Sequence, residues 1–181
     1  MSRKAVRETL ERPLASPSLR EIFHGSRRVL VVVSDATRAT GSSIFLPVLV
    51  ERIRSSSRAE IAIIIASGIH RRPTDDEIDA ILDPEVQGRF RVIRHDPDRA
   101  STLREIGRTR AGTPVRVNAA LLEHDRIVLT GGAGFHYCAG FSGGRKSLVP
   151  GLALEYLPRG TEGWLLPHGA GRLVEPSTEL Q

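Results

Sequence analysis

The residues best suited to chemistry lie in one glycine-rich stretch, Gly131 to Gly151, which reads GGAGFHYCAGFSGGRKSLVPG. It contains seven glycines, the only cysteine of the chain, His136, and Lys146, which is one of just two lysines. Glycine adopts positive φ angles freely and lets a backbone approach a ligand closely. A single internal lysine in such a loop suits covalent attachment of a cofactor or of a substrate carbonyl. The loop alone leaves open the alternative of a surface segment with a solvated lysine.

Two further polar clusters contain residue types that complement this loop. Thr37 and Arg38, expected beside a helix amino terminus, suit a phosphate group, and Asp35 suits a ribose hydroxyl. His70, together with His136, suits general acid–base work near neutral pH. Each residue also has an ordinary interpretation as a cap, a solvated charge or a loop residue, because loops are polar by default.

Apolar runs predict the strands that must position these clusters. Residues 29–33 and 60–67 are continuous and rich in β-branched side chains, as in strands buried on both faces of a parallel sheet. Shorter strands are expected at residues 91–95, 113–118 and 126–130, the last of them also buried.

Helical spacing of apolar residues predicts a helix over residues 44–54. Ser42 or Ser43 is expected to cap this helix, which places Pro47 in its first turn, where a missing N–H costs little.

Strands that alternate with helices indicate an α/β domain with a mostly parallel sheet and flanking helices, in a Rossmann-like three-layer arrangement. Thr74 with Glu77 forms a capping-box pattern for another helix, and a short helix is expected at residues 119–123. In a parallel sheet the carboxyl ends of the strands share one edge. The three polar clusters, each following a strand, are therefore expected to converge on one crevice.

Composition limits the classes of function. The 181 residues suggest one domain, and 40% hydrophobic with 26% charged residues is ordinary for a soluble globular protein. No apolar run suits a bilayer span or a secretory signal, and a single cysteine fits a reducing cytoplasm. The net charge of +5 suits an anionic partner, but the arginines are dispersed and aromatics make up only 4% of the chain. Nucleic-acid and membrane partners are not expected.

One motif nearly matches a nucleotide-binding P-loop. Residues 140–147 read GFSGGRKS, against the pattern GxxxxGK[ST], with Arg145 at a position that requires glycine. Pro150 and Gly151 follow almost at once and discourage the helix that a P-loop needs. A P-loop NTPase is therefore a distant alternative.

Three segments together resemble the amino-terminal domain of the nickel-pincer lactate racemase family. They are Ser34–Arg38 (SDATR), Ser67–Arg71 (SGIHR) and His136–Lys146 (HYCAGFSGGRK). Their order and approximate spacing agree with that family, and the AGFSGGRK string is the specific part. The resemblance covers about residues 25 to 153, which sets the expected division into an arm (1–25), a domain (26–153) and an irregular tail (154–181).

The resemblance implies a cofactor. In that family a nickel-pincer nucleotide, a pyridinium-3,5-bisthiocarboxylate mononucleotide nickel complex, is attached covalently to a lysine, and Lys146 stands at that position. The DxTR segment holds the nucleotide part, which assigns cofactor binding to Asp35, Thr37 and Arg38.

The resemblance also implies a reaction, the racemisation or epimerisation of a small-molecule 2-hydroxy acid by hydride transfer. His70 and His136 stand at the positions of the two histidines that alternate as acid and base. No metal ligand of the protein is assigned. Activity of this chain alone is left open.

The chain departs from the family pattern after Pro150-Gly151. The family continues there into a helix with a nickel-binding histidine and then into a second domain, whereas residues 154–181 are rich in proline and glycine. His168 in this tail is expected to be incidental. A truncation, a frameshift, or a split enzyme with a separate carboxyl-terminal chain or an oligomer would explain the change. The alternative function is a non-catalytic nucleotide- or phosphate-binding module, or the orphaned half of a split enzyme.

Overall fold

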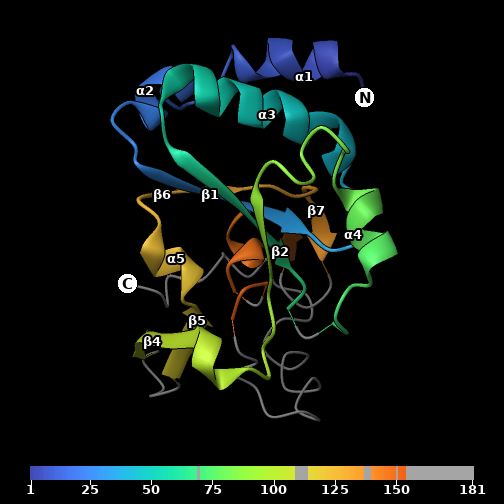
Figure 1. Cartoon of the computed structure of the whole chain (residues 1–181), viewed down its shortest axis with the longest axis vertical. Helices are drawn as coiled ribbons and strands as arrows, with labels where there is room; N and C mark the ends of the chain where they lie inside the picture. The colour runs from blue at the N-terminus through green and yellow to red at the C-terminus, as the bar shows by residue number, and fades with distance from the viewer. Residues whose placement is uncertain (69, 109–113, 137–139, 150, 154–181) are drawn as a thin grey trace.

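Two β-branched strands form the centre of the protein (Figure 1). The computed structural model describes residues 1–68, 70–108, 114–136, 140–149 and 151–153. Strand β1 (Arg28–Ser34) and strand β2 (Glu60–Ala66) each bury the residues between their ends. Strand β3 (Arg91–Arg94) and strand β6 (Arg126–Leu129) extend the sheet on either side, in the order β3-β2-β1-β6. All three pairings are parallel, so the predicted parallel α/β sheet is confirmed.

Helices cover one face of this sheet. Helix α3 (Ser42–Ser56) and helix α4 (Asp75–Ile81) pack on the face that contains Val29, Val31 and Val33. Helix α1 (Arg3–Leu10) and helix α2 (Leu19–Phe23), both in the expected amino-terminal arm, lie against α3 on its outer side (Figure 1). In the described ranges, no helix combines the length and the apolar character needed to span a membrane.

The opposite face carries a different layer. Leu30 and Val32 of β1 pack there against Val115 and Val117 of strand β5 (Pro114–Asn118) and against helix α5 (Ala120–Glu123). Strand β4 (Leu103–Arg108) pairs antiparallel with β5. Figure 1 shows this layer below the sheet and the larger helices above it. Strand β5 was expected from the sequence, but β4 was not, because only its first residue is buried and it lacks an apolar run.

Two other expectations required correction. Helix α3 begins at Ser42 rather than after a serine cap, and its N-cap is Gly41 with a φ of 73°. The Ser42 hydroxyl instead donates to the Ile81 carbonyl at 2.9 Å, which ties α3 to α4. Pro47 consequently lies inside the helix, beyond its first turn. Strand β6 lies at the edge of the sheet, so it is half exposed rather than fully buried.

The capping box of α4 is confirmed. The Thr74 hydroxyl accepts from the Glu77 N–H at 3.2 Å, and the Thr74 N–H donates to the Glu77 carboxylate at 2.9 Å. The same kind of box, with Ser18 and Glu21, begins α2. This second S-x-x-E signal was present in the sequence and was not used.

A buried histidine follows β3 and joins the two layers. His95 is 1% exposed, and its neighbour Asn118 is 5% exposed. The Asn118 Oδ1 accepts from the Ala120 N–H at 3.0 Å, so its Nδ2 amide faces the His95 Nδ1 at 3.3 Å. Nδ1 must then accept a hydrogen bond, and the proton sits on Nε2, which lies 3.3 Å from the Ala153 carbonyl oxygen. His95 is therefore held as a neutral side chain with one defined tautomer.

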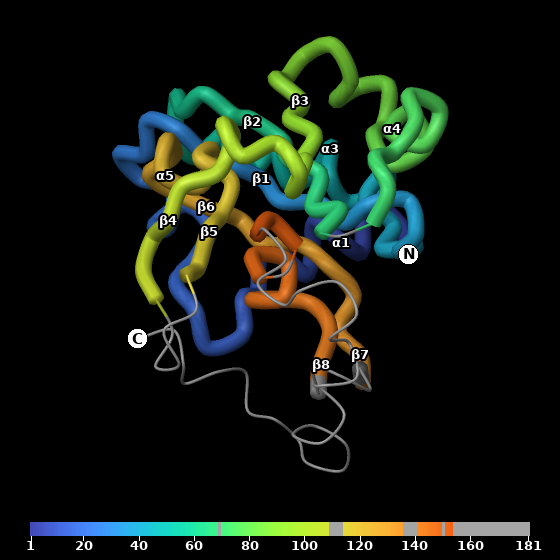
Figure 2. The backbone as a smooth tube through the Cα atoms, turned by 90° about the horizontal axis from the view of Figure 1, so that it is seen from below, coloured from blue at the N-terminus to red at the C-terminus, as the bar shows by residue number. Residues whose placement is uncertain are grey.

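This network fixes the end of the glycine-rich stretch. The Asn118 N–H donates to the Leu152 carbonyl at 2.8 Å, and the Gly68 N–H donates to the Gly151 carbonyl at 3.0 Å. Leu152 is fully buried. Residues 144–149 and 151–153, drawn in orange, consequently lie between β5 and strands β7 (Gly134–His136) and β8 (Gly140–Ser142) in Figure 2.

Stability is expected to fall in mild acid because of His95. Burial lowers the pKa of His95 below its ordinary value of 6.5, so the unfolded chain binds the proton more readily. The contribution of neutral His95 to the free energy of unfolding is therefore fully present above pH 6.5 and declines as the pH falls below 6.5. Urea unfolding across this range should show the decline. His95→Gln should flatten the pH dependence and cost about 1–3 kcal/mol near neutral pH. His24→Gln is the matched control, because His24 is exposed. If His95→Gln showed the same pH dependence of stability as the unsubstituted protein, the assignment of that dependence to His95 would be wrong.

A substitution at Gly151 should loosen the same segment. A Cβ added there would overlap the Ser147 carbonyl oxygen, so the backbone would have to move. Gly151→Ala should therefore reduce the free energy of unfolding by about 1–3 kcal/mol. Gly132→Ala is the control, since a Cβ there meets nothing within 4 Å. Equal melting temperatures for the two variants would refute the close contact.

Candidate functional site

A buried carboxylate organises the segment that follows β1. Asp35 is 4% exposed. Its Oδ1 accepts from the Thr37 N–H at 3.1 Å and from the Thr37 hydroxyl at 2.6 Å. An aspartate that binds the backbone two residues on forms a compact turn. The chain is thereby held in a defined position as it leaves the sheet.

His70 lies on the other oxygen of this carboxylate. Its Nδ1 is 2.6 Å from the Asp35 Oδ2 and 3.3 Å from the Thr37 hydroxyl. With Asp35 ionised, Nδ1 carries the proton and donates it, which leaves Nε2 as an unprotonated acceptor. A carboxylate that binds one ring nitrogen fixes both the tautomer and the orientation of a histidine. The His70 side chain is 40% exposed, whereas that of Asp35 is 5% exposed, so the pair joins a buried anchor to an accessible base.

The register of the sheet brings these two residues together. Ser34, the last residue of β1, is opposite Ala66, the last residue of β2. Asp35 and Ser67 therefore leave the sheet side by side, and the His70 N–H donates to the Ser67 carbonyl at 2.9 Å in the turn that follows. The sequence placed both residues at strand ends but assigned Asp35 to a ribose and did not predict its bond to His70. The parallel register was the signal that could have found it.

Lys146 lies on a short turn at the same edge of the sheet. The 3₁₀ helix η2 (Gly144–Ser147) contacts both β1 and β6. The Ser147 hydroxyl donates to the Thr130 carbonyl at 3.2 Å, at the end of β6. Lys146 itself is half-buried. The turn that carries the lysine is therefore held against the same edge as Asp35 and His70.

Glycine is required where this turn meets the strand end. Gly143 has a φ of 82°, and a Cβ there would lie 3.1 Å from the Gly132 carbonyl oxygen. A Cβ on Gly131 would meet only ordinary van der Waals contacts, at 3.5 Å from the Gly143 Cα and 3.9 Å from the Ser34 hydroxyl. The positive φ and the close approach at Gly143 therefore explain one of the glycines of this stretch.

Strands β7 and β8 form an antiparallel hairpin within the glycine-rich stretch, where a loop was expected. The Ser142 hydroxyl, at the end of β8, donates to the Gly132 carbonyl at 3.1 Å and so links the end of β8 to the segment before β7. Phe135 and Phe141 stack across it with ring centroids 5.5 Å apart, and Phe135 is 86% exposed. His136 ends β7, paired with Gly140, but its side chain lies outside the described residues, as does Cys138. The predicted opposition of two histidines stays a prediction.

Two arginines near the site differ in their partners. Arg71 donates to both carboxylate oxygens of Glu77, at 2.8 and 2.5 Å. These hydrogen bonds are the main cause that lowers the pKa of Glu77 to about 2. Arg38 is exposed, and its guanidinium has no hydrogen bond or ion pair with the residues that the structure describes. Arg38 is thus available to an anion, whereas Arg71 serves the start of α4.

The arrangement combines an oriented imidazole, an exposed guanidinium, a lysine and a close-packed glycine turn. Such a set can bind an anionic group and move a proton. No group of three or more potential metal ligands occurs among the described residues. The structure brings Asp35, Thr37 and His70 into direct contact and places the turn of Lys146 at the same edge. The tail and His168 lie outside the described residues.

Comparison with known proteins gives one consistent result. The family model of the lactate racemase N-terminal domain matches residues 1–156. Lactate racemase of Thermoanaerobacterium thermosaccharolyticum is 34% identical over 149 residues, which are 82% of this chain and 35% of that protein. Lactate racemase of Lactiplantibacillus plantarum is 32% identical over 151 residues, 83% of this chain and 36% of that protein. The chain thus spans about a third of the length of these relatives.

Solved structures agree with this result. The lactate racemase apoprotein of T. thermosaccharolyticum superposes with a TM-score of 0.79 at 34% identity, over 84% of this chain and 37% of that one. A protein of Thermotoga maritima superposes with a TM-score of 0.74 at 23% identity, over 97% of this chain and 45% of that one, and shows the shared fold alone. Since the match extends over most of the chain in sequence and in structure, this protein belongs to the lactate racemase N-terminal domain family.

Proposed function

We propose that this chain forms the cofactor-binding and proton-transfer part of a lactate-racemase-type enzyme, which inverts the hydroxyl-bearing carbon of a 2-hydroxy acid. The observation that carries the proposal is the Asp35–His70 pair, bonded at 2.6 Å, at the sheet edge that also holds the turn of Lys146. The chain spans about a third of its relatives, and in this proposal the complete enzyme also needs a counterpart of the remaining part of those relatives.

His70 acts as a base in this proposal. Asp35 holds the Nδ1 proton, so the accessible Nε2 can take the hydroxyl proton of the substrate and later return it. The buried carboxylate also stabilises the imidazolium that forms. We assign the same acid–base role on the other face of the substrate to His136, which ends the hairpin strand β7. Two histidines on opposite faces would make the reaction run in both directions.

The site fits a nucleotide cofactor that is attached through a lysine. Gly143 and Gly144 both adopt positive φ, and a Cβ on Gly144 would meet nothing within 4 Å, so the turn is open at Gly144, two residues before Lys146. Arg38 offers an exposed guanidinium, next to Thr37, for the phosphate. We propose that Lys146 carries the nickel-pincer nucleotide and that Asp35, Thr37 and Arg38 hold its nucleotide part. When bound, this group would accept a hydride from the substrate carbon and return it.

The second candidate function is that of a non-catalytic nucleotide-binding module. It follows from the length of the match, because a chain that spans about a third of its relatives could bind the nucleotide at Thr37 and Arg38 without turnover. Covalent loading and turnover must therefore be measured separately.

The intact mass of the chain tests the attachment. The chain is produced in a host that makes the nickel-pincer cofactor, with full-length L. plantarum lactate racemase as the positive control. We expect a mass increase that is lost in Lys146→Ala and kept in Lys4→Ala, since Lys4 is the only other lysine. An unmodified mass beside a loaded positive control would overturn the covalent proposal and favour the second candidate.

The tautomer of His70 tests the proton-transfer role. In NMR spectra of the imidazole nitrogens, His70 should carry its proton on Nδ1, because Asp35 accepts it at 2.6 Å. Asp35→Asn should shift the proton toward Nε2 and, in an assembly that turns over lactate, slow the reaction by about 10²–10⁴-fold. Asp75→Asn is the control, since Asp75 is exposed and bonds only Arg94 among the described side chains. An Nε2–H tautomer in the unsubstituted chain would contradict the assigned role.

A further inference from the structure

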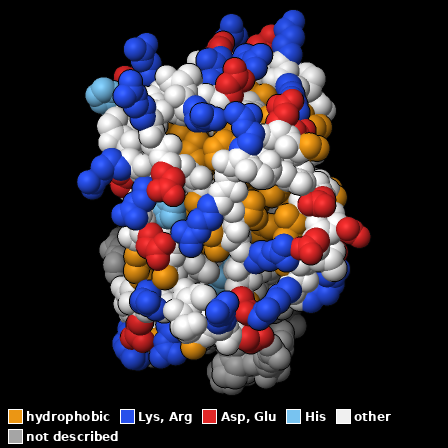
Figure 3. All heavy atoms as spheres, in the orientation of Figure 1, with side chains coloured by type: hydrophobic (Ala, Val, Ile, Leu, Met, Phe, Trp, Pro, Cys, Tyr) orange, Lys and Arg blue, Asp and Glu red, His pale blue; other side chains and the backbone are white. Residues whose placement is uncertain are grey.

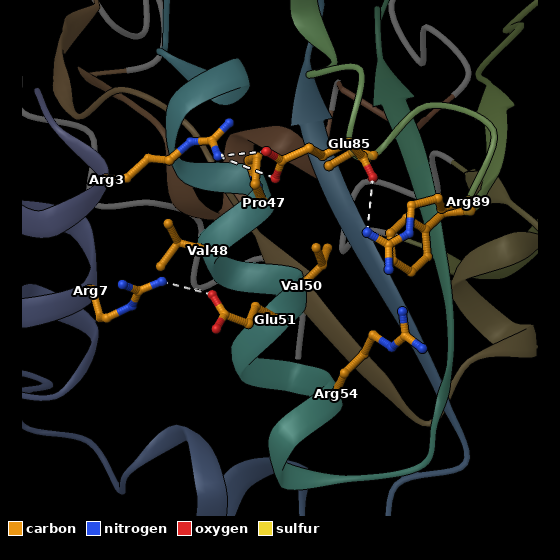
Figure 4. A pocket seen from close by; sticks show the side chains of 11 residues that line it. Arg3, Arg7, Pro47, Val48, Val50, Glu51, Arg54, Glu85 and Arg89 are labelled. Atoms are coloured by element: carbon orange, nitrogen blue, oxygen red, sulfur yellow. Dashed lines mark hydrogen bonds and ion pairs between the residues drawn. The ribbon is translucent and has the colours of Figure 1, made fainter.

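A separate hollow of about 350 Å³ lies on the helical face of the sheet, away from the glycine-rich stretch (Figure 4). Its walls come from α1, from α3 and from residues 85–90, and none of its lining residues belongs to the site described above. Small-molecule pockets begin at about 300 Å³, so the hollow is large enough for a compact ligand. We propose that this hollow binds a small organic monocarboxylate with an alkyl chain.

Most charges around the hollow neutralise one another. Arg3 of α1 donates to Glu85 at 3.1 Å and to Asp83 at 2.7 Å. Arg7, one turn further along α1, donates to Glu51 of α3 at 2.8 Å. These exposed ion pairs hold α1 over the rim and occupy the carboxylates that line the hollow.

Two arginines in the hollow are not neutralised in this way. Arg54 has no hydrogen bond or ion pair with the residues that the structure describes, and Arg89 reaches only the Glu85 carbonyl, at 3.5 Å. Figure 4 shows both side chains extending into the space between α3 and the segment that carries Arg89. A guanidinium presents paired donors that match a carboxylate, so these two residues form the anion-binding end of the proposed site.

The rest of the lining is apolar. Phe90 is half-buried and Val50 is 6% exposed, so these two side chains present apolar surface in the hollow, whereas Val48 and Val86 are 2% and 0% exposed. An alkyl chain laid against Phe90 and Val50 would leave water while its carboxylate stayed with the arginines. This combination favours an anion with an apolar body over an inorganic anion, which would make no use of the apolar surface.

The number of uncompensated charges limits the size of the anion. Among the lining arginines that the structure describes, only Arg54 and Arg89 lack a carboxylate partner, so a polyanion such as a nucleic acid would find too few cations here to neutralise it. On the face drawn in Figure 3, Lys and Arg side chains are likewise interspersed with Asp and Glu and form no continuous basic surface. A single negative charge on a narrow molecule suits the hollow best.

Titration with octanoate, followed by NMR on the full chain, tests the proposal. We expect saturable shifts of the Phe90 ring and of the Val50 methyl groups, with a Kd of about 1 mM or tighter. Acetate, which has the head group alone, and octanol, which has the body alone, should each bind at least about tenfold more weakly. Shifts that rise without saturation, or acetate that binds as well as octanoate, would overturn the proposal even without any variant.

Charge-neutralising variants then test the two arginines. Arg54→Gln with Arg89→Gln should weaken octanoate binding at least about tenfold. The matched control is Arg20→Gln with Arg58→Gln, two exposed arginines that do not line the hollow. Amide spectra report whether each variant stays folded. Equal affinity in the two double variants would show that octanoate binds by its alkyl chain alone, and it would refute the proposed anion-binding role of Arg54 and Arg89.

Discussion

The parallel pairing of β1 with β2 is the constraint on which the candidate site depends. Both strands bury their central residues on both faces, so a shift of register by one residue would exchange the side chains that pack against the two layers. With the register held in this way, Ser34 lies opposite Ala66, so β1 and β2 end side by side. The segments that follow the two strands therefore start next to each other, which brings Asp35 into contact with His70.

Buried polar groups then hold the loops around this edge. Asp35 makes three hydrogen bonds, two with Thr37 and one with His70. The side chains of His95 and Asn118 bond to each other behind the neighbouring strand. A buried polar group without a partner is costly, so each of these bonds allows few alternative loop positions. The two networks flank the end of β2, and the second ties it to Gly151 and Leu152 at the end of the glycine-rich stretch. The turn of Lys146 is therefore supported from β1, β6 and β5 together.

Much of the fold followed from local patterns. The runs at residues 29–33 and 60–67 are unambiguous strands, and Thr74 with Glu77 marks the start of α4. Strand β4 could not be predicted in the same way, because its outward-facing polar residues carry no apolar pattern and it is stabilised by pairing with β5. The cap of α3 was misassigned because Ser42 uses its hydroxyl for a residue far along the chain, Ile81.

The sequence by itself determined the parallel sheet, the residue types at each strand end and the family resemblance, since all of these reside in short stretches of neighbouring residues. The tertiary structure alone decided that Asp35 orients His70, that His95 is neutral with its proton on Nε2, and that Arg54 and Arg89 share a hollow. Each of these depends on atoms contributed by segments far apart in the chain. Their relative positions are set by strand register and by packing of the two layers, which no local pattern encodes.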